Sequence, residues 1–470
     1  MNILPDFTIT DSKKFKFTNA QYYVLEGEYT RYIIYRTLVT NIEVILNLTE
    51  QTEYNSRKRY ENKNIIERFV LECINHGITP YINNNLDTIK QTSNTVSNTV
   101  KLKKKHNEYE YEYEYEYEYR YIEMGDIRDV NYELLSHSLF FNPILENTNS
   151  LQSTYYYNKM LNEYTEKHIT VNKHQIQKIV KLFVDYNKQF NERFNKHLIV
   201  SSVSTILNYK PNYKSIKCSI TLKNEEYIHI QYRDYVKIIN TKRYYKLIKN
   251  YDKPQPYDIL RMILRYSIFD MSSQQWSIGD SLYEDISEIF DISFEMFASP
   301  LNFNMNMFCS MFLDTDKIFG SIGSFYGLEV EKILNQNIKG VFFNPPYLPI
   351  LMSKCTSQCL QLLDDMNKLN VDFTIVSFLP NWSDAVYIKR FIQSKYVIVS
   401  RIVNKGNYVL HEKDKGKLIN GTFDLLVIVL NSIKKDWCID KYDSVAKNVD
   451  NIIKIMKEET REVFIKKHNN

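Results

Sequence analysis

The stretch "GVFFNPPYLPILM", residues 340–352, decides how the C-terminal half of this 470-residue chain is interpreted. An apolar run ends at Asn344, two prolines follow, and a second apolar run begins after Tyr347. Consecutive prolines exclude both strand and helix interior, because proline fixes φ and lacks an amide hydrogen. The stretch therefore predicts a buried strand, a rigid turn and a buried helix. Such a turn is either an ordinary strand end or, as in many α/β enzymes, the place where the chemistry occurs.

Strands that alternate with helices are predicted on both sides of this turn, after about residue 272. The strand candidates are "ISFEMF" (292–297), "GVFF" (340–343), "DFTIVSFL" (372–379), "KYVIVSRIV" (395–403) and "TFDLLVIVL" (422–430). Helical patterns cover residues 348–369 and 384–393, whereas residues 404–421 join the last two strands as a loop without a helical pattern. A mainly parallel sheet that ends in such a hairpin is the layout of Rossmann-like methyltransferases, although other α/β sheets share it.

The rest of the chain is predicted to be mainly helical. Residues 1–150 form an N-terminal helical region that contains a low-complexity insertion at about 91–121, with six Glu-Tyr repeats. Residues 151–270 form a basic helical domain, in which interleaved Lys, Arg and Tyr suit a nucleic acid. They precede the Rossmann-like domain at residues 271–435 and a C-terminal helical tail at residues 436–470. The fold class is therefore α/β, with a mainly helical domain before the catalytic sheet.

Positive charge is concentrated in one part of the chain. Residues 151–250 contain 18 Lys and Arg against 7 Asp and Glu, so this segment carries +11 although the whole chain carries only +4. Such a segment indicates either a polyanionic partner or a solvated helical face. The six cysteines are scattered, which is typical of an intracellular protein. Cys355 and Cys359 are interpreted as packing residues of a helix rather than metal ligands.

The turn at residues 344–347 carries groups that suit an exocyclic amine on an adenine ring. The lone pair of such an amine is delocalised into the ring, so the nitrogen is a poor nucleophile. An Asn side-chain oxygen and a Pro carbonyl can accept its hydrogens and direct the lone pair toward an incoming methyl group, and proline keeps that carbonyl rigid. A neighbouring aromatic ring can stack on the base. The predicted catalytic residues are therefore Asn344, Pro345, Pro346 and Tyr347.

The sequence around this turn resembles a known family. The blocks "FASPLN" (297–302), "CS" (309–310), "DTD" (314–316), "FGSIG" (319–323) and "NPPY" (344–347) stand in the order typical of the cap-specific adenosine N6-methyltransferases, first described as phosphorylated-CTD-interacting factor. The likeness begins near "ILRMILRYSIF" (259–269) and covers about 170 residues. It implies an S-adenosylmethionine-dependent RNA adenine-N6 methyltransferase, with capped mRNA or another adenosine-containing RNA as its partner.

The resemblance also implies roles for individual residues. Asn344 and Pro345 would hold the adenine amine, and Tyr347 would stack on the base where the family usually has Phe. The block after the first strand would take the place of a Gly-rich loop, and the cofactor-binding residues would be Glu295, Phe297, Ala298, Ser299, Pro300, Asn302, Asp314, Asp316, Gly320 and Ser321. The substrate-binding residues would be Tyr347, Pro380 and Trp382, with Lys242 and Arg243 from the basic and aromatic stretch "TKRYYKLIKNYDK".

Several alternatives stay open at this level. Ala298 and Pro300 also fit tight loop packing, Asp314 and Asp316 a solvated turn, and Trp382 a core position. The chain has three Trp, at positions 276, 382 and 437, so no WW domain is evident and binding to the polymerase tail is not expected. DNA adenine methylation and a nucleic-acid-binding protein with a decayed site remain alternative functions, whereas protein glutamine methylation normally uses a Gly-rich first loop.

Overall fold

The computed structural model describes residues 17, 19–50, 52–71, 160–161, 164–165, 167, 169–198, 216–249, 254–269, 275–382, 385–433 and 439–468. The chain divides into two units, one of Met1–Arg68 with Ile199–Asn470 and one of Phe69–Leu198. The predicted low-complexity insertion at about 91–121 lies outside the described residues. Within the described ranges, no helix combines the length and the apolar character that a membrane span requires.

The unit Phe69–Leu198 contains the amphipathic helix α5 (Lys173–Leu198). Apolar residues spaced by three or four positions place Ile176, Ile179 and Phe183 on one buried stripe. The ring of Phe69 packs against that of Phe183, with 4.8 Å between the centroids. The helical pattern of this segment therefore buries its apolar side in the way the spacing predicts.

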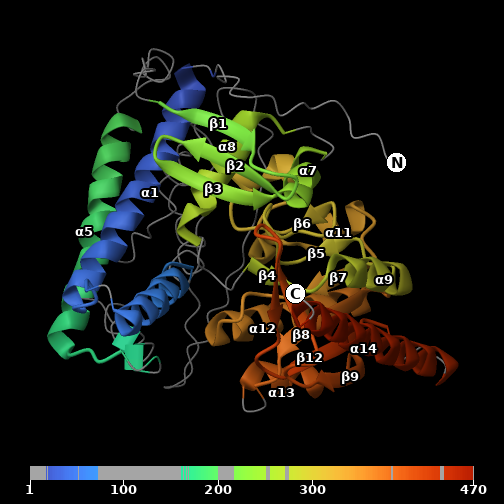
Figure 1. Cartoon of the computed structure of the whole chain (residues 1–470). Helices are drawn as coiled ribbons and strands as arrows, with labels where there is room; N and C mark the ends of the chain where they lie inside the picture. The colour runs from blue at the N-terminus through green and yellow to red at the C-terminus, as the bar shows by residue number, and fades with distance from the viewer. Residues whose placement is uncertain are drawn as a thin grey trace, which may run out of the picture. The chain divides into compact units, whose positions relative to one another are not determined.

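The other unit contains a six-stranded sheet, whose strands are labelled in Figure 1. Its strands are β5 (Phe294–Glu295), β6 (Met307–Phe308), β7 (Gly340–Phe343), β8 (Thr374–Pro380), β9 (Val397–Val403) and β12 (Leu425–Asn431). They lie in the order β6-β5-β7-β8-β12-β9. The first four run parallel, whereas β12 is antiparallel to both β8 and β9. This confirms the predicted α/β class and the five predicted strand segments.

Helices cover both faces of this sheet because its central strands are apolar on both sides. Every residue of β7 and of β12 is buried, which is typical of strands covered on two faces. One face packs against α9 (Asp280–Phe290) and α14 (Ile439–His468). On the other face, Phe391 of α13 (Val386–Ile392) packs on Phe343, with ring centroids 5.3 Å apart. α12 (Pro349–Lys368) follows the diproline turn and buries Cys355 and Cys359.

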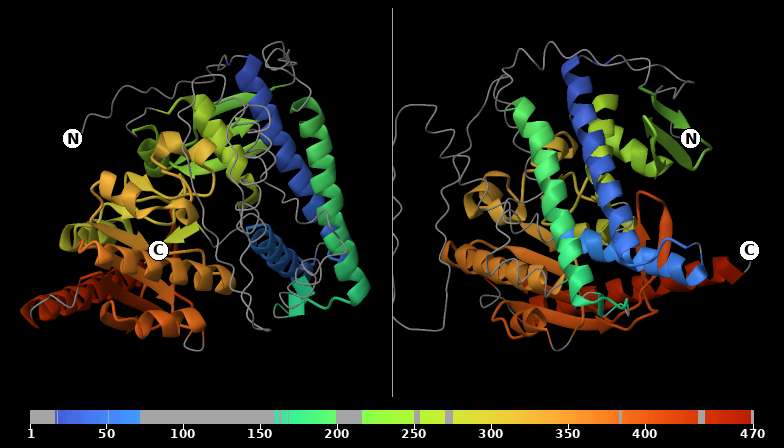
Figure 2. Two further views of the ribbon diagram at one scale, coloured as in Figure 1. Left: turned by 180° about the vertical axis from the view of Figure 1, so that it is seen from behind. Right: turned by 90° about the vertical axis from the view of Figure 1, so that its left-hand side faces the viewer.

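A second sheet corrects the expectation that residues 151–270 are helical throughout. β1 (Cys218–Leu222), β2 (Tyr227–Tyr232) and β3 (Tyr235–Asn240) form an antiparallel meander, seen from two further sides in Figure 2. Its β-branched and aromatic residues alternate between buried and accessible positions, which is the period of a strand and not of a helix. The helices α7 (Thr241–Ile248) and α8 (Pro256–Tyr266) then follow.

The predicted loop at residues 404–421 is also wrong in detail. It contains the hairpin strands β10 (Val409–Glu412) and β11 (Lys417–Asn420), and β10 also pairs with β4 (Trp276–Ser277). Gly416 has φ of 64°, in the left-handed region that a tight connection between two strands needs. The hairpin contacts the meander, because Lys237 and Asp414 form a buried ion pair of 2.8 Å. The meander and the hairpin belong to the same unit as the catalytic candidates.

Candidate active site

The sheet has a topological switch point between β5 and β7. The chain passes from β5 to β6 on one side of β5 and later returns to β7 on its other side. In open α/β sheets, ligands bind at the carboxyl ends of the strands beside such a point. The loop 297–302 follows β5 and the turn 344–347 follows β7, so both sequence motifs lie at this edge.

The turn after β7 is held by backbone and side-chain contacts. Phe343 and Pro345 are buried, whereas Asn344, Pro346 and Tyr347 are half-buried and retain accessible surface. The amide of Leu348 donates to the carbonyl of Pro346 at 2.7 Å, which closes the turn immediately before α12. The rigid diproline turn predicted from the sequence is therefore present.

The hydroxyl of Tyr347 contacts two carbonyl oxygens. It lies 3.0 Å from Oδ1 of Asn344 and 3.2 Å from the main-chain oxygen of Phe378 in β8. Burial raises the pKa of Tyr347 above its usual value, so the hydroxyl stays protonated and acts as a donor. The side chain of Asn344 is thus connected to the neighbouring strand through Tyr347.

An aromatic residue that precedes β12 packs against Tyr347. The ring of Phe423 meets it edge-on, at 5.6 Å between centroids and an interplanar angle of 89°. The hydroxyl of Tyr408 donates to the carbonyl of Phe423 at 2.7 Å. Phe423 reaches this edge because β12 is antiparallel, and Leu425 at its start pairs with Pro380 at the end of β8. Sequence reasoning missed Phe423, although an antiparallel last strand is the signal that could have identified it.

The loop 297–302 packs directly against the strand that leads into the turn. The amide of Met296 donates to the carbonyl of Phe342 at 2.9 Å. The ring of Phe297 lies 5.5 Å from that of Phe343, the residue before Asn344. Within the loop, Oδ1 of Asn302 accepts a hydrogen bond of 2.8 Å from the amide of Ser299. The two motifs predicted from the sequence are therefore brought together, and the loop is stabilised by its own side chains.

Glu295 and Arg243 support this loop from inside the protein. The carboxylate of Glu295 accepts from the amides of Asn304 and Met305, at 2.6 and 3.0 Å. The guanidinium of Arg243 donates to the carbonyl of Pro300 at 2.8 and 3.2 Å and to that of Phe303 at 2.8 Å. The expectation that Arg243 binds substrate is therefore corrected, because this side chain is buried and its donors hold the loop. Its neighbour Lys242 is exposed, so a substrate contact there stays a prediction.

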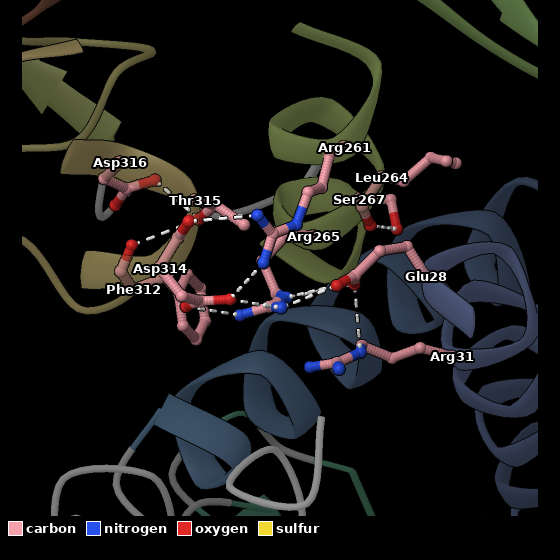
Figure 3. Close-up of polar contacts among 10 residues, drawn as sticks. All are labelled: Glu28, Arg31, Arg261, Leu264, Arg265, Ser267, Phe312, Asp314, Thr315 and Asp316. Atoms are coloured by element: carbon pink, nitrogen blue, oxygen red, sulfur yellow. Dashed lines mark hydrogen bonds and ion pairs between the residues drawn. The ribbon is translucent and has the colours of Figure 1, made fainter. Parts of the chain in front are cut away.

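Asp314 belongs to a buried cluster of charged residues, shown in Figure 3. Its carboxylate lies 2.7 Å from Arg261 and 3.0 Å from Arg265, both on α8. Arg265 also pairs with Glu28 of α1 (Asn19–Ile45) at 2.6 Å, and Glu28 lies 3.2 Å from Arg31. A carboxylate that two guanidinium groups neutralise in the interior has a structural role. It joins α1, α8 and the short helix α10 (Leu313–Asp316).

Asp316 is buried as well, and hydroxyl groups contact its carboxylate. Its carboxylate accepts from the hydroxyl of Tyr266 at 2.6 Å and from that of Thr315 at 2.8 Å. Burial raises its pKa from 3.8 to about 6, because the charged form loses its hydration. Asp314 and Asp316 are therefore not a solvated turn. The loop after them turns at Gly320, with φ of 104°, and Ser321 is hydrogen-bonded to Ser310 at 2.7 Å.

The residues that keep accessible surface decide which side chains at this edge could contact S-adenosylmethionine. The acidic candidates Glu295, Asp314 and Asp316 are engaged inside the protein, so they are poor partners for a cofactor in this arrangement. Ser299, Pro300 and Ser321 are buried as well. The half-buried candidates, which keep accessible surface, are Phe297, Ala298, Asn302 and Gly320. The position at the switch point therefore fits a cofactor, while the set of residues that could contact it is smaller than the sequence predicts.

The end of β8 supplies the remaining substrate candidates. Pro380 is buried at the strand end, and Trp382 keeps 37% of its surface exposed. The ring of Trp382 meets that of Tyr387 edge-on, with centroids 6.3 Å apart. Trp382 is therefore partly exposed and not a core residue.

Comparisons with known proteins agree with the motifs. Residues 242–412 match the family model described as the phosphorylated CTD interacting factor 1 WW domain. Two proteins named mRNA (2'-O-methyladenosine-N(6)-)-methyltransferase, from Mus musculus and Homo sapiens, are each 30% identical to this chain over 135 residues. The match covers 28% of this chain and only 18% of each relative. These findings confirm the family resemblance that the sequence motifs indicate.

The description of the matching family model names a WW domain, which conflicts with the expectation that no such domain is evident. That expectation was based only on the number and positions of the Trp residues. The matched residues begin in α7 and end with β10, and they include β5, β7 and β8 of the six-stranded sheet. The match therefore covers both the loop 297–302 and the turn 344–347.

Proposed function

We propose that this chain is an S-adenosylmethionine-dependent methyltransferase that acts on N6 of adenosine in RNA, at the nucleotide next to the mRNA cap. The observation that carries the proposal is the position of the turn 344–347. It follows β7 at the switch point and lies beside the loop 297–302. The strand order, with four parallel strands and a reversed β12 beside β8, supports a Rossmann-like class I methyltransferase domain.

The residues of the turn can bind and orient an adenine amine. Oδ1 of Asn344 and the carbonyl of Pro345 would accept the two N6 hydrogens, and the ring of Tyr347 would stack on the base. Stacking of this kind contributes about 1–3 kcal/mol per base. The residues that would hold S-adenosylmethionine are Phe297, Ala298, Asn302 and Gly320, all half-buried at the same edge. The cofactor supplies the methyl group when bound.

This chemistry needs no strong base in the protein. Once the nitrogen carries the methyl group, its surplus proton is acidic enough to leave to solvent water, so the chain's own task is to hold the base and direct its lone pair. Positioning of this kind can supply about 7–11 kcal/mol of the activation barrier. The neutral groups at the turn suit that task better than a positively charged residue would, because a nearby positive charge would repel the sulfonium of the cofactor.

The substrate class is supported by the names of the two relatives, which specify mRNA and 2'-O-methyladenosine. The test is formation of S-adenosylhomocysteine with three oligonucleotides of one sequence: capped RNA that begins with adenosine, the same RNA without a cap, and single-stranded DNA. Turnover that requires capped RNA supports the full proposal. Equal turnover on uncapped RNA would refute the cap-adjacent site, and a preference for DNA would refute the RNA assignment.

The residue assignment is tested separately with Asn344→Ala. The matched control is Asn335→Ala, at an exposed position in α11 (Val330–Asn335). We expect Asn344→Ala to abolish transfer while thermal unfolding and cofactor binding remain unchanged, and Asn335→Ala to alter none of them. Calorimetry with S-adenosylmethionine distinguishes an enzyme from a decayed site, because RNA binding without any cofactor binding would contradict the proposal.

A further inference from the structure

The hydroxyl of Tyr347 makes hydrogen bonds that are separate from any stacking by its ring. A hydroxyl group has one hydrogen and so donates to one acceptor at a time. Two carbonyl oxygens lie within reach, Oδ1 of Asn344 at 3.0 Å and the main-chain oxygen of Phe378 at 3.2 Å. Phe378 belongs to β8 and is fixed by the sheet, whereas the amide of Asn344 is at the end of a rotatable side chain.

Only one of these two acceptors would also contact the adenine amine. Oδ1 of Asn344 is the atom that would accept the adenine amine, and an amide oxygen has two lone pairs. The hydroxyl of Tyr347 occupies one of them before a base arrives and so limits rotation of the amide. The carbonyl of Phe378 offers the hydroxyl a second acceptor when the amine is bound. The ring is held edge-on by Phe423, at 89°, so the hydroxyl stays between its two acceptors.

We propose that the Tyr347 hydroxyl is a positioning group that fixes the side-chain amide of Asn344 for recognition of a 6-amino purine, with Phe378 as its alternative acceptor. This inference rests on the proposed function, because it concerns the same adenine site. Its effect is distinct from stacking, since stacking depends on the ring alone and accepts any base. The hydroxyl is therefore expected to set the preference for purines that carry a 6-amino group.

The experiment measures binding of two labelled RNAs by fluorescence anisotropy. One carries adenosine at the target position and the other carries purine riboside, which has the same ring system without the amine. Each is titrated with wild type, Tyr347→Phe, Asn344→Ala and the double variant. Tyr396→Phe is the matched control. Tyr396 is a buried residue just before the start of β9, away from the carboxyl edge of the sheet, and its hydroxyl donates to Asp364 of α12.

We expect Tyr347→Phe to reduce the preference for adenosine about three- to tenfold, the range of one hydrogen bond. Binding of the purine riboside RNA should stay within about twofold, because the ring remains. The double variant should show no further loss relative to Asn344→Ala, since the hydroxyl acts through Asn344. Tyr396→Phe should keep the full preference.

Three outcomes would overturn the inference, and they are distinguishable. A wild-type protein that does not prefer adenosine refutes the adenine site and with it the proposed function. A normal preference in Tyr347→Phe refutes the role of the hydroxyl alone. An additive loss in the double variant shows that Tyr347 does not act through Asn344. Thermal unfolding of each variant shows whether a loss of preference comes from a loss of fold.

Discussion

Replacement of Asp314 by alanine tests whether this residue supports the fold or binds the cofactor. Its carboxylate is buried and lies 2.7 Å from Arg261 and 3.0 Å from Arg265. Removal of one partner from a buried ion pair costs about 3–5 kcal/mol, because the remaining charge is left without compensation. Glu28 still neutralises Arg265 at 2.6 Å, so the loss falls mainly on Arg261 and the lower end of that range is expected.

The assay is denaturant and thermal unfolding, followed by calorimetry with S-adenosylmethionine well below the unfolding temperature. A loss of about 3 kcal/mol corresponds to a fall in Tm of roughly 6–12 °C for a large domain. Asp450→Ala is the matched control, because it breaks an Asp–Arg pair with Arg401 that is 55% and 40% exposed. That exposed pair should contribute at most about 1 kcal/mol. If Asp314→Ala unfolds like the control but no longer binds the cofactor, the structural assignment is wrong.

Three further predictions concern the loop, the buried carboxyl and the end of β8. Arg243→Ala should weaken cofactor binding by about tenfold or more, because the carbonyls of Pro300 and Phe303 lose their donors. Lys242→Ala is the control and should leave cofactor binding unchanged. Equal effects of the two substitutions would refute the role of Arg243 in holding the loop. Asp316 has its pKa raised from 3.8 to about 6, so the folded state binds this proton more tightly than the unfolded state does. Its contribution to the free energy of unfolding is complete below about pH 4 and falls by about 3 kcal/mol as pH rises through 6. Asp316→Asn should remove this fall in denaturant unfolding measured from pH 4 to 7.5. An unchanged pH profile in this variant would contradict the prediction. Trp382→Ala should weaken RNA binding by about fivefold or more with little change in Tm, since this ring is partly exposed. A large fall in Tm with normal RNA binding would instead assign Trp382 to the core.

The sequence allowed the strands of the six-stranded sheet and the turn after β7 to be predicted because their signals are local. An apolar run before two prolines determines where β7 ends, and the motif after β5 lies where the alternation of strands and helices places it. The meander β1–β3 was missed because its strands have only five or six residues each, and the helical patterns on either side outweighed their short alternation.

The roles of Arg243 and Asp314 could not be predicted for a different reason. Both have charged side chains in polar stretches, where a solvent or ligand contact is the usual expectation. Their partners are remote in sequence: Arg243 contacts the carbonyls of Pro300 and Phe303, and Asp314 contacts Arg265 beside Glu28. Only the packing of α7 against residues 300–303, and of α8 against α1 and α10, decides that these charges are inside.

The position of the transferred methyl group tests the proposed adenine-N6 methylation most directly. The measurement is mass spectrometry of nucleosides released from capped RNA that begins with adenosine, after incubation with the protein and S-adenosylmethionine. We expect N6-methylated adenosine from the wild-type protein and none from Asn344→Ala. Methylation at a ribose oxygen, at a ring nitrogen, or at N6 with Asn344→Ala as active as wild type would contradict it.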